Sequence, residues 1–316
     1  MLSRRGFVSG TLGTGLTLAA QGAQPAAGQS PVAAPARKRL IVDAQVHLWK
    51  AESADWPWVP GMTPQLPEPF TIEKLVPMMD EAGVDRAVIV PPSWPGDRND
   101  YGLEAAKRHP DRFAVMGRIS LPKPESAALL PKWKEQPGML GVRVTFTRLP
   151  GASGWLSDGT ADWFWPAAEK AGLPVMFLAP GNVPAMARIA ERHPQLTLVM
   201  DHMALSVDIA KAKKIPEAIE QTVTMAKYPN VSVKLTSSPL YSSEPYPFRD
   251  MTVHLRRCFD AFGPRRCHWG TDITNSLAKA TYRQRVTQFT EELDFLSEED
   301  KDWVMGRAIL ERLGWK

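Results

Sequence analysis

Eight short apolar segments recur along the chain, and a stretch compatible with a helix follows most of them. Each segment is about four to seven residues long and apolar almost throughout, as expected for a strand buried on both faces. Their spacing of roughly 25 to 45 residues leaves room for one strand, one helix and two loops. The segments are Leu40–Val46, Arg86–Val90, Ala114–Ile119, Gly141–Phe146, Pro174–Leu178, Thr197–Met200, Val231–Leu235 and Cys267–Gly270.

Several of the intervening stretches end on Gly or on His-Pro, which are common helix stop signals. Strands and helices in this alternation are typical of an α/β fold with a parallel sheet, and eight units predict a (β/α)₈ barrel, the TIM barrel. A doubly wound open sheet is the alternative, but no glycine-rich phosphate loop follows the first strand. The expected helices are Thr71–Ala82, Tyr101–His109, Asp162–Ala171, Val183–His193, Ile215–Lys227, Thr252–Phe262 and Lys279–Leu293.

The first 36 residues differ from the rest of the chain. Arg4, Arg5 and Phe7 precede a mildly apolar run over residues 8–20, and small residues follow. This order is that of a secretory signal, and the arginine pair resembles the twin-arginine signal that carries folded proteins across a bacterial inner membrane. An ordinary disordered N-terminus is the alternative. We expect residues 1–36 to be a signal peptide with its linker, and residues 37–316 to be one periplasmic barrel domain.

Charge and composition exclude some kinds of partner. The net charge is +4, and residues 1–36 hold two arginines and no acid, so the remainder carries 4 − 2, about +2. With no block of lysine or arginine, nucleic acid is not expected as a partner. No segment after the signal is long and apolar enough for a membrane helix. Cys258 and Cys267 are the only cysteines, and we expect buried free thiols rather than a disulfide.

Polar residues gather at the predicted carboxyl ends of the strands, where (β/α)₈ barrels carry their active sites. The first strand ends in Asp43, Gln45 and His47, and a period of two predicts that all three point into the barrel mouth. His and Asp at separate strand ends can serve as metal ligands or as acid–base groups. Other candidates near strand ends are Arg143, His202, Lys234 and Asp272.

Each of these residues also has a structural interpretation. His202 alone can be a satisfied structural histidine, Asp272 a helix N-cap and Arg143 a surface charge. Their joint placement at strand ends favours a functional set. The remaining histidines are expected to be structural, because they lie at helix ends or on a helix: His109, His193 and His254. The Pro- and Trp-rich stretch Asp55–Pro69 is expected to be a long loop belonging to the site.

Several motifs in this order resemble the amidohydrolase-2 family over residues 40 to 316. They are "IVDAQVHLW", "VMDHMALS", "VSVKLTSS", "YPFRD", "CHWGTD" and "VMGRAILERLGW". Within the family, the chain is most similar to the lactonase branch, which includes 2-pyrone-4,6-dicarboxylate lactonase and L-fucono-lactonase. The stretch "VIVPPSWPGDRNDYGLEAAKRHPDRFAVMGRI" also resembles this branch. The resemblance implies a barrel hydrolase that acts on a small molecule.

Three departures from the family pattern bear on metal binding. The family's first strand usually carries His-x-His, and here Gln45 stands at the first histidine. The fifth-strand histidine of metal-dependent members falls near Leu178, and Ile273-Thr274-Asn275 stands where relatives often have Trp-Pro-His. A stable zinc site needs three or four ligands. We therefore expect no cofactor; if a zinc or manganese ion is bound, the ligands are His47, His202 and Asp272.

The preferred hypothesis is metal-free hydrolysis of a lactone or similar ester on a small carboxylated molecule. Asp272 is expected to act as general base on water, with His47, His202 and Gln45 stabilising the oxyanion. Arg143 is the expected grip on a substrate carboxylate, because arginine pairs with carboxylates in a bidentate way. Further substrate-binding candidates are Lys234, Tyr241, Arg249 and Asn275, with Trp49, Trp56, Trp58 and Trp94 in the pocket wall.

Two other functions stay open at this point. A metal-dependent hydrolase or a non-oxidative decarboxylase is possible, since the wider family contains both. A periplasmic binding or sensing protein on a decayed barrel is the third reading, because Gln45 and Leu178 are what the loss of an active site would produce. The retention of His47, His202 and Asp272 argues against it.

Overall fold

The computed structural model describes residues 38–147 and 149–316. The expected signal peptide and its arginine pair lie outside the described residues. Within the described ranges, no helix has both the length and the apolar character needed to cross a lipid bilayer.

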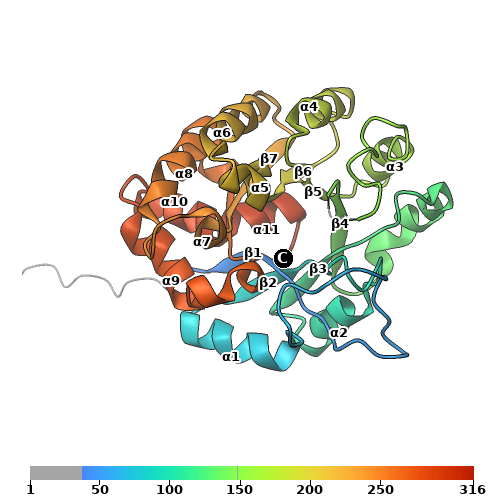
Figure 1. The fold of residues 1–316 in the computed structure, drawn as a ribbon, viewed down its shortest axis with the longest axis horizontal. Helices are drawn as coiled ribbons and strands as arrows, with labels where there is room; N and C mark the ends of the chain where they lie inside the picture. The colour runs from blue at the N-terminus through green and yellow to red at the C-terminus, as the bar shows by residue number, and fades with distance from the viewer. Residues whose placement is uncertain (1–37, 148) are drawn as a thin grey trace, which may run out of the picture. The chain divides into compact units, whose positions relative to one another are not determined.

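Eight parallel strands form one nearly closed barrel in the order β1 to β8, and helices surround it (Figure 1). The expected (β/α)₈ fold is confirmed, and all eight expected strands are present with ends shifted by a few residues. The strands are β1 (Val42–Val46), β2 (Arg86–Ile89), β3 (Phe113–Gly117), β4 (Met139–Thr145), β5 (Val175–Leu178), β6 (Leu198–Met200), β7 (Val231–Thr236) and β8 (Cys267–Gly270).

The helices follow the expected positions in most places. Those expected from the sequence are α1 (Ile72–Ala82), α2 (Asp100–Arg108), α3 (Phe164–Lys170), α4 (Val183–Arg192), α6 (Ile215–Val223) and α8 (Arg249–Phe262). The single helix expected over Lys279–Leu293 is instead α9 (Tyr282–Thr287) followed by a π-helical turn (Gln288–Glu292). Elements that the sequence did not predict include the 3₁₀ helix η1 (Pro124–Glu135), α5 (Val207–Lys211), α7 (Ser238–Tyr241), α10 (Glu298–Asp302) and α11 (Ala308–Leu313).

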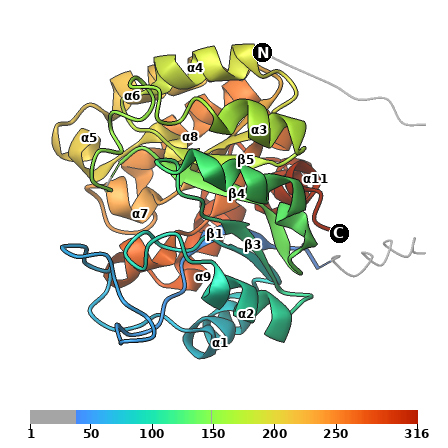
Figure 2. The same cartoon turned by 90° about the vertical axis from the view of Figure 1, so that its right-hand side faces the viewer.

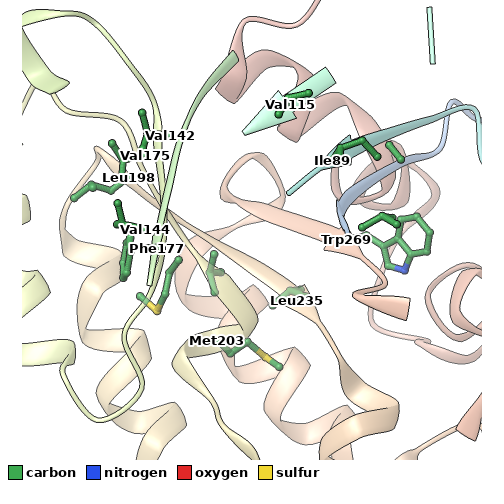
Figure 3. Close-up of a cluster of buried hydrophobic side chains, with 14 of the residues drawn as sticks. Ile89, Val115, Val142, Val144, Val175, Phe177, Leu198, Met203, Leu235 and Trp269 are labelled. Carbon is green, nitrogen blue, oxygen red and sulfur yellow. The ribbon is translucent and has the colours of Figure 1, made fainter. Parts of the chain in front are cut away.

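The strands are buried on both faces, as their apolar runs predict. One set of side chains packs outward against the helices, including Val144, Phe177 and Leu235 (Figure 3). A second cluster lines the inside of the barrel and contains Val42, Ala44, Val88, Val90, Met116, Met176 and Val199.

Helix α11 closes the barrel at the amino ends of the strands. Its Ile309 and Leu313 join the inner cluster. Arg312 donates to carbonyl oxygens at the start of β6 and just before β7. The loop after β1, α5 and α7 lie at the opposite end of the molecule (Figure 2). The mouth is therefore the open end, where the carboxyl ends of the strands meet.

The Asp43 side chain links β1 to the end of β8 and does not point into the mouth of the barrel. Its carboxylate accepts from the Thr271 backbone N–H at 2.8 Å and from the Tyr282 hydroxyl at 2.7 Å. The β1 register shifts between Asp43 and Val46, so the strict period of two fails there. The prediction that Asp43 points with Gln45 and His47 is wrong for this reason.

The two cysteines are buried free thiols, as expected. Burial raises the pKa of the Cys258 thiol to about 12 and that of Cys267 well above its usual value. Both thiols are therefore protonated at neutral pH and chemically inert.

Candidate active site

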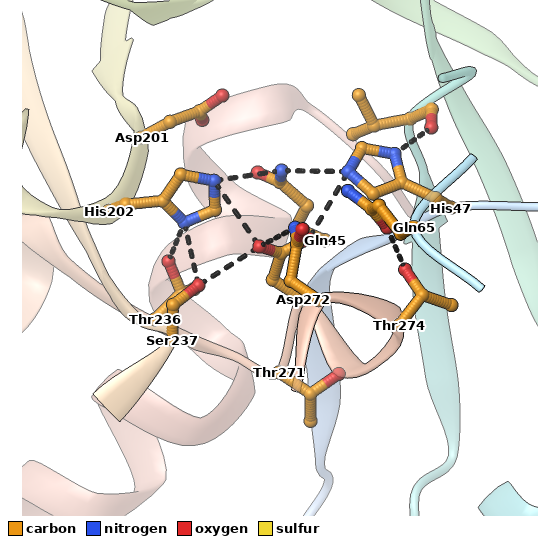
Figure 4. Close-up of polar contacts among 12 residues, drawn as sticks. Gln45, His47, Gln65, Asp201, His202, Thr236, Ser237, Thr271, Asp272 and Thr274 are labelled. Carbon is orange, nitrogen blue, oxygen red and sulfur yellow. Dashed lines mark hydrogen bonds and ion pairs between the residues drawn. The ribbon is translucent and has the colours of Figure 1, made fainter. Parts of the chain in front are cut away.

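Sharp turns end three of the strands that reach the mouth. His202 after β6, Ser237 after β7 and Asp272 after β8 all have left-handed backbone, with φ of 53°, 67° and 47°. This conformation is costly for residues other than glycine, and it clusters at functional sites. The three side chains converge there with Gln45 and His47 of the β1 end (Figure 4).

The four predicted catalytic residues form one buried cluster. Gln45 Nε2 lies 3.5 Å from His47 Nε2 and 3.2 Å from His202 Nε2. The two Asp272 oxygens lie 3.2 Å from His47 Nε2 and 3.7 Å from His202 Nε2. None of the four side chains is more than 5 % exposed. The structure thus brings together the residues that the sequence placed at separate strand ends.

The outer ring nitrogens of the two histidines have different partners, and the partner of His47 fixes where its proton lies. His47 Nδ1 lies 2.6 Å from the Val90 carbonyl, which can only accept, so this nitrogen carries the hydrogen. Ser237 gives its hydroxyl hydrogen to Asp272 at 3.0 Å, and His202 Nδ1 lies 3.1 Å from the Ser237 hydroxyl and 2.5 Å from the Thr236 hydroxyl, which can donate or accept. The neutral form of the His47 ring therefore presents a lone pair at Nε2 to the centre of the cluster.

Asp272 is held in its ionised form. Burial by itself raises the pKa of this carboxyl; positive charge on His202 or His47 lowers it whenever either ring is protonated, and hydrogen bonds from Asn275 at 2.5 Å and from Ser237 at 3.0 Å also favour the ionised form. The pKa of Asp272 therefore lies well below its usual range. Burial lowers the pKa of His202, and the nearby Asp272 only partly offsets this, so the ring is neutral at neutral pH.

Lys234 and Arg143 meet at a carboxylate that the sequence analysis did not select. Lys234 Nζ lies 2.8 Å from Asp201 Oδ1 and Arg143 Nε lies 3.1 Å from Asp201 Oδ2. Lys234 also donates to Gln45 Oε1 at 2.8 Å and is fully buried. Lys234 is therefore enclosed beneath the cluster. The available signal for Asp201 was its position directly before His202 at a strand end.

The other predicted binding residues differ in where they lie. Asn275 contacts Asp272, and the Tyr241 hydroxyl donates to the Leu205 carbonyl at 3.2 Å. Arg249 lies at the exposed start of α8, where it pairs with Glu292 at 3.4 Å, and the structure does not bring it to the cluster.

The long loop after β1 packs over the mouth. Trp49 and Trp94 meet edge to face with ring centroids 4.9 Å apart. Gln65 accepts a hydrogen bond from Thr274, which follows β8 (Figure 4). The tryptophans therefore serve mainly to hold the loop, while its Gln65 meets the loop that carries Asp272.

A cavity of about 200 Å³ lies beside Arg143 at the ends of β3 and β4. Its lining includes a second arginine, Arg118, which the sequence analysis missed although it directly follows β3. Arg118 is 3 % exposed, and its Nη1 has no hydrogen-bond partner among the described residues. Burial lowers the pKa of Arg118 to about 10, so it stays charged at neutral pH. Two buried guanidinium groups next to one cavity are suited to an anionic ligand.

Comparison with known proteins agrees with this arrangement. The sequence profile described as amidohydrolase, Amidohydro_2, matches residues 42–311. The chain belongs to the amidohydrolase family. An L-fucono-1,5-lactonase from Burkholderia ambifaria is 28% identical over 234 residues, covering 73% of this chain and 79% of that protein. A 4-sulfomuconolactone hydrolase from Hydrogenophaga intermedia is 30% identical over 214 residues, covering 66% and 67%.

A solved amidohydrolase structure has the same fold. The enzyme from Burkholderia multivorans superposes with a TM-score of 0.73 at 19% identity, covering 87% of this chain and 99% of that one. That structure contains bound zinc. Whether the present amidohydrolase has a site for such an ion depends on its own side chains.

The position of the Gln45 side chain disfavours a metal ion between the two histidines. Two imidazole lone pairs and the Asp272 carboxylate are groups that zinc binds. However, the Gln45 amide nitrogen faces both lone pairs, and the Lys234 ammonium lies 2.8 Å behind the amide oxygen. As arranged, these residues do not fit a divalent cation. Within residues 38–147 and 149–316, no group of three or more His, Cys, Asp or Glu is placed to hold one.

Proposed function

We propose that this amidohydrolase hydrolyses the lactone ring of a small carboxylated molecule without a metal. The observation that carries the proposal is the buried Asp272 carboxylate between the imidazoles of His47 and His202. The cavity with two arginines is bordered by Arg143, which shares Asp201 with Lys234 beneath the cluster, and it offers a place for a substrate carboxylate. Two relatives that are named as lactone hydrolases support the same reaction class.

In the proposed reaction, Asp272 takes a proton from a water molecule as the water oxygen bonds to the lactone carbonyl carbon. The proton passes from Asp272 to His47 Nε2, 3.2 Å away. Once His47 is protonated, it no longer accepts from the Gln45 amide, and that N–H faces the oxyanion. The ring C–O bond then breaks, and His47 returns the proton to the leaving oxygen. The product is a hydroxy acid, whose new carboxyl ionises.

A lactone screen with metal analysis tests the reaction class. Carboxylated lactones, 4-sulfomuconolactone among them, and neutral lactones, L-fucono-1,5-lactone among them, are offered to the purified protein, and acid release is followed with a pH indicator. We expect turnover of at least one carboxylated lactone, with well under one equivalent of zinc or manganese bound. Treatment with 1,10-phenanthroline should leave the rate unchanged. Stoichiometric metal with a loss of activity in the chelator would contradict the metal-free mechanism, and no turnover at all would favour a binding protein.

The pH dependence tests the protonation states. We expect kcat/KM to be constant from pH 8 down to about 6.5, the ordinary pKa of histidine, and to fall only below it. Burial lowers the pKa of His202, so acidification protonates this ring late. Asp272, with its low pKa, contributes no loss over this window. The measurement is kcat/KM between pH 4.5 and 9. A fall centred above pH 7 would rule out this pair of protonation states.

A further inference from the structure

We infer that Lys234 is a positioning residue that holds the Gln45 side chain with its NH₂ group, rather than its oxygen, toward the two active-site imidazoles. This inference rests on the proposed function for its catalytic consequence, since Gln45 is the proposed oxyanion donor. The geometric part stands on the contacts of Lys234 alone.

The orientation of the Gln45 amide follows from the chemistry of its neighbour. The two ends of a glutamine amide look alike in shape, so hydrogen-bond partners must decide between them. A lysine ammonium has three donors and no acceptor. The amide atom 2.8 Å from Lys234 Nζ must therefore be the oxygen. The nitrogen then faces the rings of His47 and His202 at 3.5 and 3.2 Å.

The amide orientation in turn sets the state of the imidazoles. With hydrogens arriving from Gln45, each ring keeps its Nε2 as an acceptor and its hydrogen on Nδ1. This agrees with the outer contacts: the Val90 carbonyl accepts from His47 Nδ1, and the Thr236 and Ser237 hydroxyls beside His202 Nδ1 can both accept from it. An oxygen in the same place would instead favour a hydrogen on Nε2. Lys234 thus acts on both rings through Gln45.

A buried charged lysine loses its hydration, and this costs free energy unless its protein partners compensate for the loss. Lys234 is fully buried, and burial lowers its pKa while Asp201 raises it. Asp201 also binds Arg143, so one carboxylate joins Lys234 to an arginine that borders the cavity. Met176 Sδ lies 2.9 Å from Lys234 Nζ and offers only a weak acceptor. The strong acceptors of this ammonium are therefore Asp201 and Gln45. Of these two, Gln45 is the one that contacts the active-site imidazoles.

Nitrogen NMR of the imidazoles tests the geometric part without any substrate. In the wild type, the ¹⁵N shifts of His47 and His202 should report Nε2 without a hydrogen at pH 8. Lys234→Met removes the ammonium, so the amide oxygen is free to turn inward, and His202 Nε2 should become protonated. Lys107→Met, an exposed lysine on α2, is the control and should leave the spectrum unchanged. An unchanged His202 in folded Lys234→Met overturns the inference.

A second variant keeps the test decisive if Lys234→Met does not fold. In Gln45→Glu, an oxygen faces the rings whichever way the side chain lies, so His202 Nε2 should again gain a hydrogen. If His202 keeps its wild-type shifts there, the side chain at position 45 does not control the ring, and the inference fails.

A double-mutant cycle on kcat tests the catalytic consequence. Loss of one oxyanion donor typically lowers kcat by about 10²-fold or more, and we expect this of Lys234→Met and of Gln45→Met. Because Lys234 acts through Gln45, the double variant should be no more than about threefold slower than either single variant. A merely structural role would multiply the two losses to about 10⁴-fold, which would contradict the inference. If no lactone is turned over, the proposed function fails, and the NMR result still decides the inference.

Discussion

Asp272→Asn is expected to lower kcat by about 10³-fold or more, with KM for the lactone changed by less than about threefold. Asparagine has nearly the same shape and can keep contacts with its neighbours, but it cannot accept a proton from water. Asp272 is 1 % exposed and contacts both imidazoles, so solvent has little access to replace it as base.

The measurement is steady-state hydrolysis on the lactone found in the screen, together with substrate binding to the variant by calorimetry. Asp294→Asn, the same substitution at an exposed position, is the control and should retain the wild-type rate. A kcat within tenfold of wild type for folded Asp272→Asn would remove Asp272 from the mechanism and leave His47 as the candidate base.

Arg143→Met is expected to raise KM for a carboxylated lactone by about 10²-fold, since losing one charged partner of a buried pair costs about 2–5 kcal/mol. It should also lower kcat, because Arg143 shares Asp201 with Lys234. Arg118→Met should raise KM in the same way and leave kcat nearly unchanged, since its contacts are with Asp97 and the Gly96 carbonyl.

Neutral lactones distinguish a loss of carboxylate recognition from a general disruption of the pocket. Both arginine variants should show nearly wild-type KM for a neutral lactone, while the preference for the carboxylated substrate falls. Arg256→Met, on the exposed face of α8, is the control. An equal rise in KM for neutral and carboxylated lactones would show that the arginines support the pocket without binding a carboxylate.

The sequence predicted the barrel well because the signal for a doubly buried strand is local. All eight strands are apolar runs, and their number and order determine the topology. The prediction errors arise where a tertiary contact overrides a local sequence rule. Asp43 departs from the period of two because β1 changes register there and its carboxylate is needed at the seam with β8. The helix expected over Lys279–Leu293 changes to a π-helical turn after Thr287.

The catalytic cluster was also accessible from the sequence, since strand ends in a barrel converge. The role of Lys234 was not, because its partner Gln45 lies 189 residues away in the chain. From sequence alone, a lysine next to a strand end is most simply a group for substrate. Arg118 was missed for a similar reason: only the folded chain shows that it borders the same cavity as Arg143.

Because α11 closes the barrel at the amino ends of the strands, the C-terminal end of the described chain is a suitable place to attach the protein to a support or to another molecule. The described chain ends at Lys316, whose carbonyl accepts from Arg86 at the start of β2, at the amino end of the barrel. A fluorescent reporter, a solid support or a second enzyme joined there would sit opposite the mouth. Tethering through this end should therefore leave the entry of substrate and the exit of product unobstructed.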